Sequence, residues 1–194
     1  MTPIIGEPRR INPLLRLGIL IAERTTGRRT APARLLAWAP RTAIGAGMLE
    51  ATAVHRIPGL DARHLKLARL AASLTTNCAF CIDMNAHAHR EAGLTDREVY
   101  ALRDGNEDDE PGFSASERLV IAYARALSQT PPATEDDLLA AMAATFTEQQ
   151  VVLLAATVAS VNYWARFNQG LGIPSAGFGD HCLLPADPGP VPEP

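Results

Sequence analysis

Apolar residues recur at intervals of three and four along nearly the whole chain, and no stretch alternates apolar with polar positions as a half-buried strand would. This periodicity predicts an all-α protein. Asp61 is placed to cap one helix, and Ser/Thr-x-x-Glu/Gln capping boxes begin at Thr95, Ser114 and Thr147. The helices predicted from these signals cover residues 13–25, 32–38, 41–54, 61–75, 78–92, 95–102, 114–130, 134–144 and 147–171.

The segments between these helices carry turn residues. Thr76-Asn77 separates two helices, Gly93 is a C-terminal stop, and Pro131-Pro132 ends another helix. Residues 104–112 form an acidic run that we interpret as a solvated connector. Residues 172–194 are rich in Pro and Gly, so we expect an irregular tail that docks on its own chain or on a neighbour.

Composition narrows the class of protein. Hydrophobic residues make up 47% of the 194 residues, which is enough for a substantial interior. The net charge of -3 gives no basic footprint, so no nucleic acid is expected as a partner. The best N-terminal apolar run, residues 14–22, is interrupted by Arg16, too short to span a bilayer and not followed by a cleavage pattern. We therefore expect a cytoplasmic protein with no membrane partner. No glycine-rich phosphate loop or dinucleotide fingerprint is present, so no cofactor is expected.

The pair Cys78-Ala79-Phe80-Cys81 carries the candidate chemistry. Two thiols three positions apart can close a disulfide across one helical turn, and a helix N-terminus favours the reactive thiolate. On a helical wheel Cys78 and Asn85 lie about 60° and about 40° from Cys81, so the three share a face. The third cysteine, Cys182, is expected to be a tail thiol.

The histidines that follow are the nearest acid–base groups in sequence. His89 lies about 80° and His87 about 120° from the thiols on the same wheel, so His89 is the better candidate to reach them. Idle thiols and a metal site are the alternatives to redox use. Zinc would need two further ligands, and these histidines diverge around the helix, so no metal is expected.

The segment Asn-Cys-Ala-Phe-Cys-Ile-Asp-Met-Asn, residues 77–85, resembles the alkylhydroperoxidase D (AhpD) / carboxymuconolactone decarboxylase family. The resemblance continues through Phe113-Ser-Ala-Ser-Glu-Arg and from Phe146 to Asn168. It implies an AhpD-like helical bundle with an N-terminal extension (residues 1–58), a family core (59–173) and a tail (174–194). It also implies a homo-oligomer, often a trimer or hexamer.

The activity that the resemblance implies is a thiol peroxidase or disulfide reductase. Cys81 corresponds to the attacking cysteine of the family and Cys78 to the resolving one. The implied partners are a small peroxide or organic substrate and an external dithiol that reduces the resulting disulfide.

Two positions of the family's proton relay differ in this chain. Lys66 stands twelve residues before the first cysteine, where the family has Glu, and Asn85 stands where it has His. Neither side chain performs the acid–base role of the group it replaces. We hypothesise that Lys66 stabilises a Cys81 thiolate, that Asn85 donates a hydrogen bond to the same sulfur, and that His89, or less favourably His87, carries the proton.

Two other functions remain open on this sequence. One is a non-redox lyase or decarboxylase-like enzyme that acts on a small organic acid or lactone. The other is a non-catalytic oligomer that binds a ligand in the pocket that corresponds to the family's active site. Tyr163, Trp164 and Phe167 are expected to form core or subunit contacts, with the wall of a substrate pocket as the alternative.

Overall fold

A computed structural model describes residues 2–53, 55 and 57–178 of the chain, and in these residues the fold is all-α, as predicted. A single isolated bridge pairs Ile57 with Leu60. The helices are α1 Pro13–Thr26, α2 Ala31–Leu36, α3 Pro40–Ala53, α4 Ala62–Thr75, α5 Ala79–Ala86, the 3-10 turn η1 His89–Ala92, α6 Asp96–Asp104, α7 Ala115–Ser128, α8 Asp136–Thr145 and α9 Glu148–Gly170. Val54, the last residue of one predicted helix, lies outside the described residues, as do His181 and Cys182 of the tail.

Most helix starts follow the local capping signals. Asp61 accepts the backbone N–H of His64 at 2.9 Å, and the boxes that begin at Thr95, Ser114 and Thr147 are all formed in both directions. The helix predicted over 134–144 begins later than expected, because α8 starts at Asp136, behind Glu135, and without a side-chain cap.

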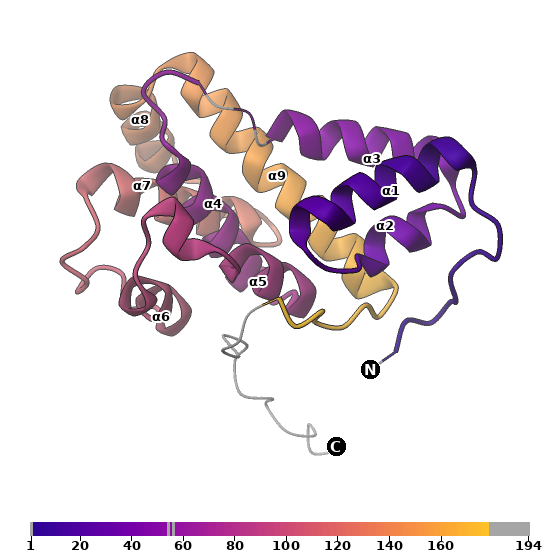
Figure 1. Cartoon of the computed structure of the whole chain (residues 1–194). Helices are drawn as coiled ribbons and strands as arrows, with labels where there is room; N and C mark the ends of the chain where they lie inside the picture. Colours follow the sequence, from indigo (N-terminus) through magenta and orange to yellow (C-terminus); the bar gives the residue numbers. More distant parts are fainter. Residues whose placement is uncertain (1, 54, 56, 179–194) are drawn as a thin grey trace, which may run out of the picture.

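The main core forms around α4, which packs against α7, α9 and α5. Leu67, Leu70 and Ala71 of α4 have no exposed surface. Figure 1 shows α9 running diagonally through the molecule, with α1–α3 on one side and α4 and α6–α8 on the other. A second, smaller cluster surrounds the two cysteines and includes Phe80 and Ala165. No helix in the described part of the chain has the length and apolar character to cross a membrane.

The N-terminal helices pack loosely on this frame. α3 packs against α9, whereas α1 has no buried residue among its fourteen. Their large exposed apolar side chains are Leu14, Leu17, Leu20 and Ile21 of α1 and Ile44 and Met48 of α3. These side chains offer apolar surface to a second copy, and the homo-oligomer stays a prediction.

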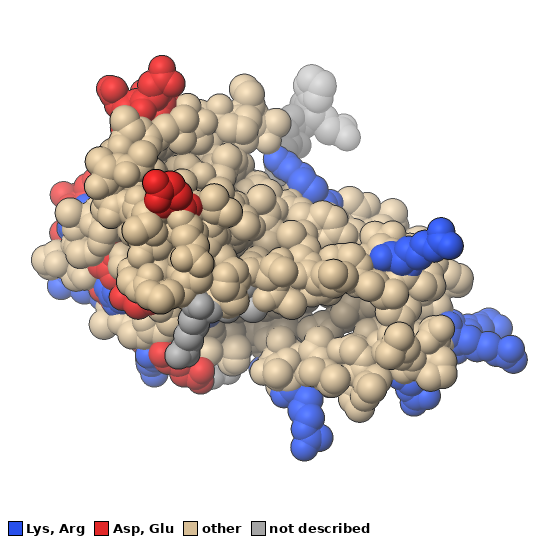
Figure 2. Space-filling model, turned by 90° about the horizontal axis from the view of Figure 1, so that it is seen from above, with Lys and Arg blue, Asp and Glu red and all other residues tan. Residues whose placement is uncertain are grey.

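Charge is divided along the molecule. Residues 1–58 contain nine arginines and three glutamates, a net +6, so residues 59–194 carry -9 of the overall -3. Figure 2 shows this division on one face, with Lys and Arg gathered toward the end that holds α1–α3 and Asp and Glu toward the other end. The basic part of the chain also supplies some of the walls of the cavity described below, and the acidic part supplies the others.

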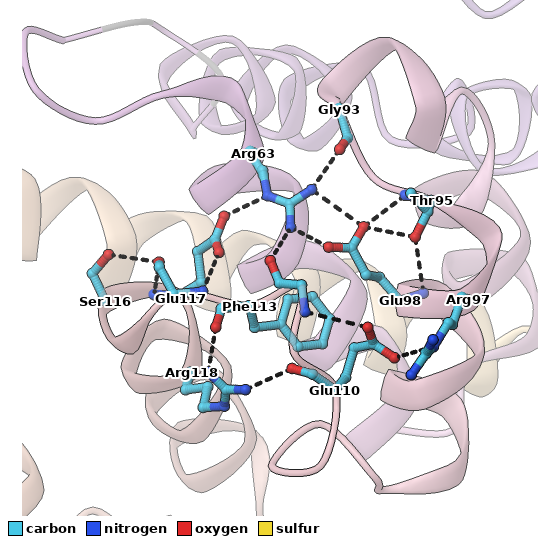
Figure 3. A network of polar contacts seen from close by, with 12 residues as sticks. Arg63, Gly93, Thr95, Arg97, Glu98, Glu110, Phe113, Ser116, Glu117 and Arg118 are labelled. Atoms are coloured by element: carbon cyan, nitrogen blue, oxygen red, sulfur yellow. Dashed lines mark hydrogen bonds and ion pairs between the residues drawn. The ribbon is translucent and has the colours of Figure 1, made fainter.

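Arg63, in the first turn of α4, ties three elements together (Figure 3). Its guanidinium forms ion pairs with Glu98 of α6 and Glu117 of α7, and it also donates to the backbone carbonyls of Gly93 and Gly112. Both glutamates complete capping boxes as well, so the helix starts of α6 and α7 are fixed to α4.

The acidic loop 104–112 differs from the solvated connector that was expected. Glu110 is 7% exposed and pairs with Arg97 at 2.7 Å, and Glu107 pairs with Arg125 at 2.6 Å. Two of its carboxylates therefore fasten the loop to α6 and α7 rather than facing water.

Candidate functional site

The two cysteines lie where α4 turns into α5. Asn77 has φ 49°, a left-handed conformation that Asn adopts more readily than most residues, and it reverses the chain before the pair. Cys78 is the N-cap of α5, and its sulfur accepts the N–H of Cys81 at 3.3 Å. The pair forms a disulfide with Cα atoms 5.2 Å apart, and each residue is 2% exposed. The predicted position at a helix start is confirmed.

A cavity of about 290 Å³ opens beside Cys81 but not beside Cys78. Its walls come from helices far apart in the sequence, and most of them are apolar or small. The residues that line it are Ala22, Thr25, Thr26, Thr30, Pro32, Ala33, Glu50, Arg69, Phe80, Cys81, Met84, Asn85, Val161, Trp164 and Asn168. Trp164 therefore forms a wall of this cavity, which was the alternative interpretation of its aromatic segment.

A buried polar chain runs along one wall of the cavity. Arg69, which is 9% exposed, donates from Nη2 to Glu50 at 2.7 Å and from Nε to the side-chain oxygen of Asn85 at 3.0 Å. Glu50 also accepts from the hydroxyl of Ser160 and the indole N–H of Trp164, each at 3.0 Å. The carboxylate in this cavity thus comes from α3 and the guanidinium from α4, and neither was singled out in the sequence.

The amide that faces the sulfurs belongs to Asn168 of α9, not to Asn85. Asn168 is 1% exposed, and its Nδ2 lies 3.5 Å from the sulfur of Cys81 and 4.0 Å from that of Cys78. Asn85 does line the cavity, but its amide donates to Ser73 at 2.8 Å. The hydrogen bond to sulfur that was expected from Asn85 is therefore made by Asn168.

Lys66 lies in a different hollow, which it lines with Ala88, Glu91 and Ala92. Its ammonium donates to the backbone carbonyl of His87, so the contacts of the described chain place this cation on the backbone rather than on a sulfur. Burial, followed by the charge of Arg69, lowers the pKa of Lys66 to about 8, although Glu91 opposes the shift.

Replacing Lys66 with methionine is expected to change the pH dependence of stability. The folded pKa of about 8 lies below the ordinary value of 10.5, so the unfolded chain binds more protons between these values. The free energy of unfolding contributed by Lys66 therefore rises with pH across this window. Urea unfolding from pH 7 to pH 10.5 should show that rise in the wild type and a flatter curve in Lys66→Met. Curves that run parallel would contradict this assignment.

The prediction of a single helix over residues 78–92 is wrong, so His87 and His89 do not lie where the helical wheel placed them. α5 ends at Ala86, Ala88 is left-handed with φ 53°, and a 3-10 turn follows. His89 is turned toward Asp96, 2.7 Å from Nε2, and its Nδ1 lies 3.0 Å from the Ala86 carbonyl. The described contacts therefore join His89 to α6 rather than to the thiols.

A C-terminal strap, residues 171–178, covers the cysteine cluster. Ile173 and Phe178 belong to this cluster, and the Phe178 ring meets Phe80 edge-on at 5.9 Å. Asp83 of α5 holds the strap by accepting the hydroxyl of Ser175 at 2.7 Å and the N–H of Phe178 at 2.9 Å. The first part of the predicted irregular tail thus docks on its own chain and shields the sulfurs.

Comparison with known proteins places this site in a family context. Residues 44–126 match the carboxymuconolactone decarboxylase family. The uncharacterized protein YnjA of Escherichia coli (strain K12) is 35% identical over 108 residues, which are 56% of this chain and 57% of that protein. The chain therefore spans little more than half the length of this relative.

Solved structures show the same fold over nearly the whole chain. An uncharacterized peroxidase-related protein with an alkylhydroperoxidase AhpD core, from Ralstonia eutropha JMP134, has a TM-score of 0.79 at 15% identity and covers 96% of this chain and 99% of that one. The debrominase Bmp8 has a TM-score of 0.74 at 20% identity, over 91% of this chain and 92% of that one. These likenesses confirm the AhpD-like fold.

Proposed function

We propose that this chain, an AhpD- and carboxymuconolactone decarboxylase-like protein, is a thiol-dependent oxidoreductase. The reaction that we propose is the reduction of a small organic peroxide. The observation that carries the proposal is the position of Cys81, which is one half of a disulfide pair and also lines the apolar cavity. A substrate in this cavity contacts Cys81. Cys78 does not line the cavity, but it is placed to form a disulfide with the oxidised Cys81.

The proposed cycle begins with the reduced pair. The Cys81 thiolate attacks the terminal oxygen of a hydroperoxide, the O–O bond breaks, and the alkoxide leaves and takes up the proton released by the thiol. Cys81 is then a sulfenic acid, and the Cys78 thiol displaces its hydroxyl as water to form the disulfide. An external dithiol restores both thiols by exchange and leaves as its own disulfide.

Three features of the site favour the Cys81 thiolate that this cycle needs. Cys81 lies in the first turn of α5, where the helix N-terminus carries partial positive charge. The amide of Asn168 lies within reach of its sulfur at 3.5 Å. Cys78, as the N-cap, is within disulfide distance, so the resolving step needs no large movement of the backbone.

The test is a stoichiometric oxidation of reduced protein with cumene hydroperoxide, in a Cys182→Ser background so that the tail thiol does not contribute. We expect one equivalent of hydroperoxide to be consumed per chain, with loss of the mass of two hydrogens and a Cys78–Cys81 link in the peptide map. Hydroperoxide that remains while both thiols stay reduced would refute the proposal. A panel with 2,3,4-tribromopyrrole, the compound bound in a structure of Bmp8, would then separate a halogenated substrate from a peroxide.

A further inference from the structure

Three buried polar atoms make no hydrogen bond within the described part of the chain, and their residues all line the Cys81 cavity. They are Oγ1 of Thr30, Nη1 of Arg69 and Oδ1 of Asn168. These residues are 7%, 9% and 1% exposed. A buried polar atom without a partner lowers stability, so native proteins rarely leave several together. Their convergence on one cavity indicates that a bound molecule supplies the partners.

The side chains of Arg69 and Asn168 are already engaged through their other polar atoms, which fixes the direction of the free ones. Arg69 is held by Glu50 and Asn85 through its other nitrogens, and Asn168 holds a sulfur with its amide nitrogen. Within the described residues, the one other buried polar atom without a hydrogen bond is Arg125 Nε, which does not line this cavity and forms an ion pair with Glu107 at 2.6 Å. The unpartnered groups of the described chain are therefore a property of the cavity.

The charge of the cavity selects an uncharged ligand. Among the residues that the structure describes, Glu50 and Arg69 are the only charged side chains that line it, and they neutralise each other at 2.7 Å. A carboxylate ligand would add an uncompensated negative charge in an apolar, weakly hydrated space, which is costly. The free N–H of Arg69 and the hydroxyl of Thr30 instead suit a neutral acceptor such as a carbonyl oxygen, and the free oxygen of Asn168 suits an N–H or O–H donor.

The size of the cavity limits the rest of the molecule. A volume of about 290 Å³ holds roughly ten non-hydrogen atoms at about 30 Å³ for each water-sized unit. The remaining walls, which include Phe80, Met84 and Val161, are apolar and suit a hydrocarbon or aromatic body.

We propose that this cavity binds an uncharged organic molecule of roughly ten non-hydrogen atoms, whose acceptor oxygen bonds Arg69 and Thr30 and whose donor bonds Asn168. This assignment rests on the proposed function in one respect, that the molecule bound beside Cys81 is the substrate. In that case the O–H of a hydroperoxide donates to Asn168, whose amide nitrogen already faces the sulfur, and the peroxide lies against Cys81.

Calorimetric titration of the oxidised protein tests binding without chemistry. The probes are benzamide, which has both a donor and an acceptor, its near-isostere benzoate, which is charged, and ethylbenzene, which has neither polar group. We expect benzamide to bind at least about tenfold more tightly than the other two, because ethylbenzene lacks both hydrogen bonds. Benzoate lacks the donor and brings an uncompensated charge into the cavity. Benzoate at or above the affinity of benzamide would overturn the inference about charge. An ethylbenzene affinity equal to that of benzamide, or no binding of any probe, would overturn the inference that these polar atoms bind a ligand. Water would then be the partner of the free atoms.

Matched variants locate the binding. Thr30→Val removes the free hydroxyl with little change in shape and should weaken benzamide by about threefold to tenfold while leaving ethylbenzene unchanged. Asn168→Leu should act in the same direction. Thr26→Val is the control, because its hydroxyl lines the same cavity but already bonds the Ala22 carbonyl at 2.9 Å. Loss of benzamide binding in Thr26→Val as large as in Thr30→Val would refute the assignment. The hydroperoxide experiment above is independent of this result, so the two proposals fail separately.

Discussion

Replacement of Arg63 by methionine is expected to lower the free energy of unfolding by about 3–5 kcal/mol, the cost of removing one partner from a buried ion pair. The side chains of Glu98 and Glu117 are 6% and 8% exposed, and the Arg63 side chain between them is 20% exposed. Methionine keeps the aliphatic packing but leaves both carboxylates facing each other without a cation (Figure 3). Two backbone carbonyls, of Gly93 and Gly112, lose a donor at the same time.

The pH dependence of this loss identifies its cause. Burial raises the pKa of Glu98 and of Glu117, but hydrogen bonds from Arg63 and from the capping groups outweigh it, so both pKa values are lowered. In the wild type their contribution is present above the unfolded pKa of about 4.3 and is lost as pH falls through the lower folded pKa. Without Arg63 burial dominates and raises both pKa values, so the variant regains stability as it takes up protons. The gap between variant and wild type should therefore narrow as pH falls toward 4.

Chemical denaturation at pH 7 and at pH 4 provides the measurement. Arg90→Met is the matched control, because Arg90 also pairs with a helix-start carboxylate, that of Asp96, but both side chains are largely exposed. Its stability should stay close to that of the wild type. An Arg63→Met variant no less stable than Arg90→Met, or a gap that widens in acid, would show that the network contributes little.

The features that the sequence predicted well are those whose causes are local. Thr95, Ser114 and Thr147 begin helices because each satisfies a backbone N–H three residues away, which the sequence displays directly. The position of the cysteine pair at the start of α5 was also predicted correctly, because its signals are local. The helix predicted over 78–92 is wrong because partners outside that helix decide where it ends. Lys66 holds the carbonyl of His87, and Asp96 holds His89.

The cavity could not be predicted, because its polar groups meet only through tertiary packing. Asn168 approaches a sulfur 87 residues away, and Glu50 joins Trp164 across 114 residues. The positions of the family's relay residues pointed to Lys66 and Asn85. A position within a family motif does not fix the direction of a side chain that is longer or has other hydrogen-bond partners. In this chain the charged pair beside Cys81 is supplied by Glu50 and Arg69 instead.

The second large effect is expected at the cysteines themselves. Cys81→Ser should lower hydroperoxide reduction with an external dithiol by on the order of a thousandfold or more, as loss of a nucleophile does in enzymes. Cys78→Ser should behave differently, because Cys81 still lines the cavity and keeps the Asn168 amide at 3.5 Å. It should reduce one equivalent of hydroperoxide per chain and then stop at the Cys81 sulfenic acid.

The two variants are separated by trapping that acid with dimedone and locating the adduct by peptide mass spectrometry, again in the Cys182→Ser background. We expect the adduct on Cys81 in Cys78→Ser and none in Cys81→Ser. An adduct on Cys78 in Cys81→Ser, with single-turnover reduction retained, would reverse the two roles. Retention of full turnover in both variants would mean that the pair does not carry the chemistry, and the cavity would then serve a ligand or a lyase reaction that needs no thiol. The resolving step has a structural reason to matter here: the strap on Asp83 shields both sulfurs, so an external dithiol reaches them less readily than Cys78 reaches Cys81.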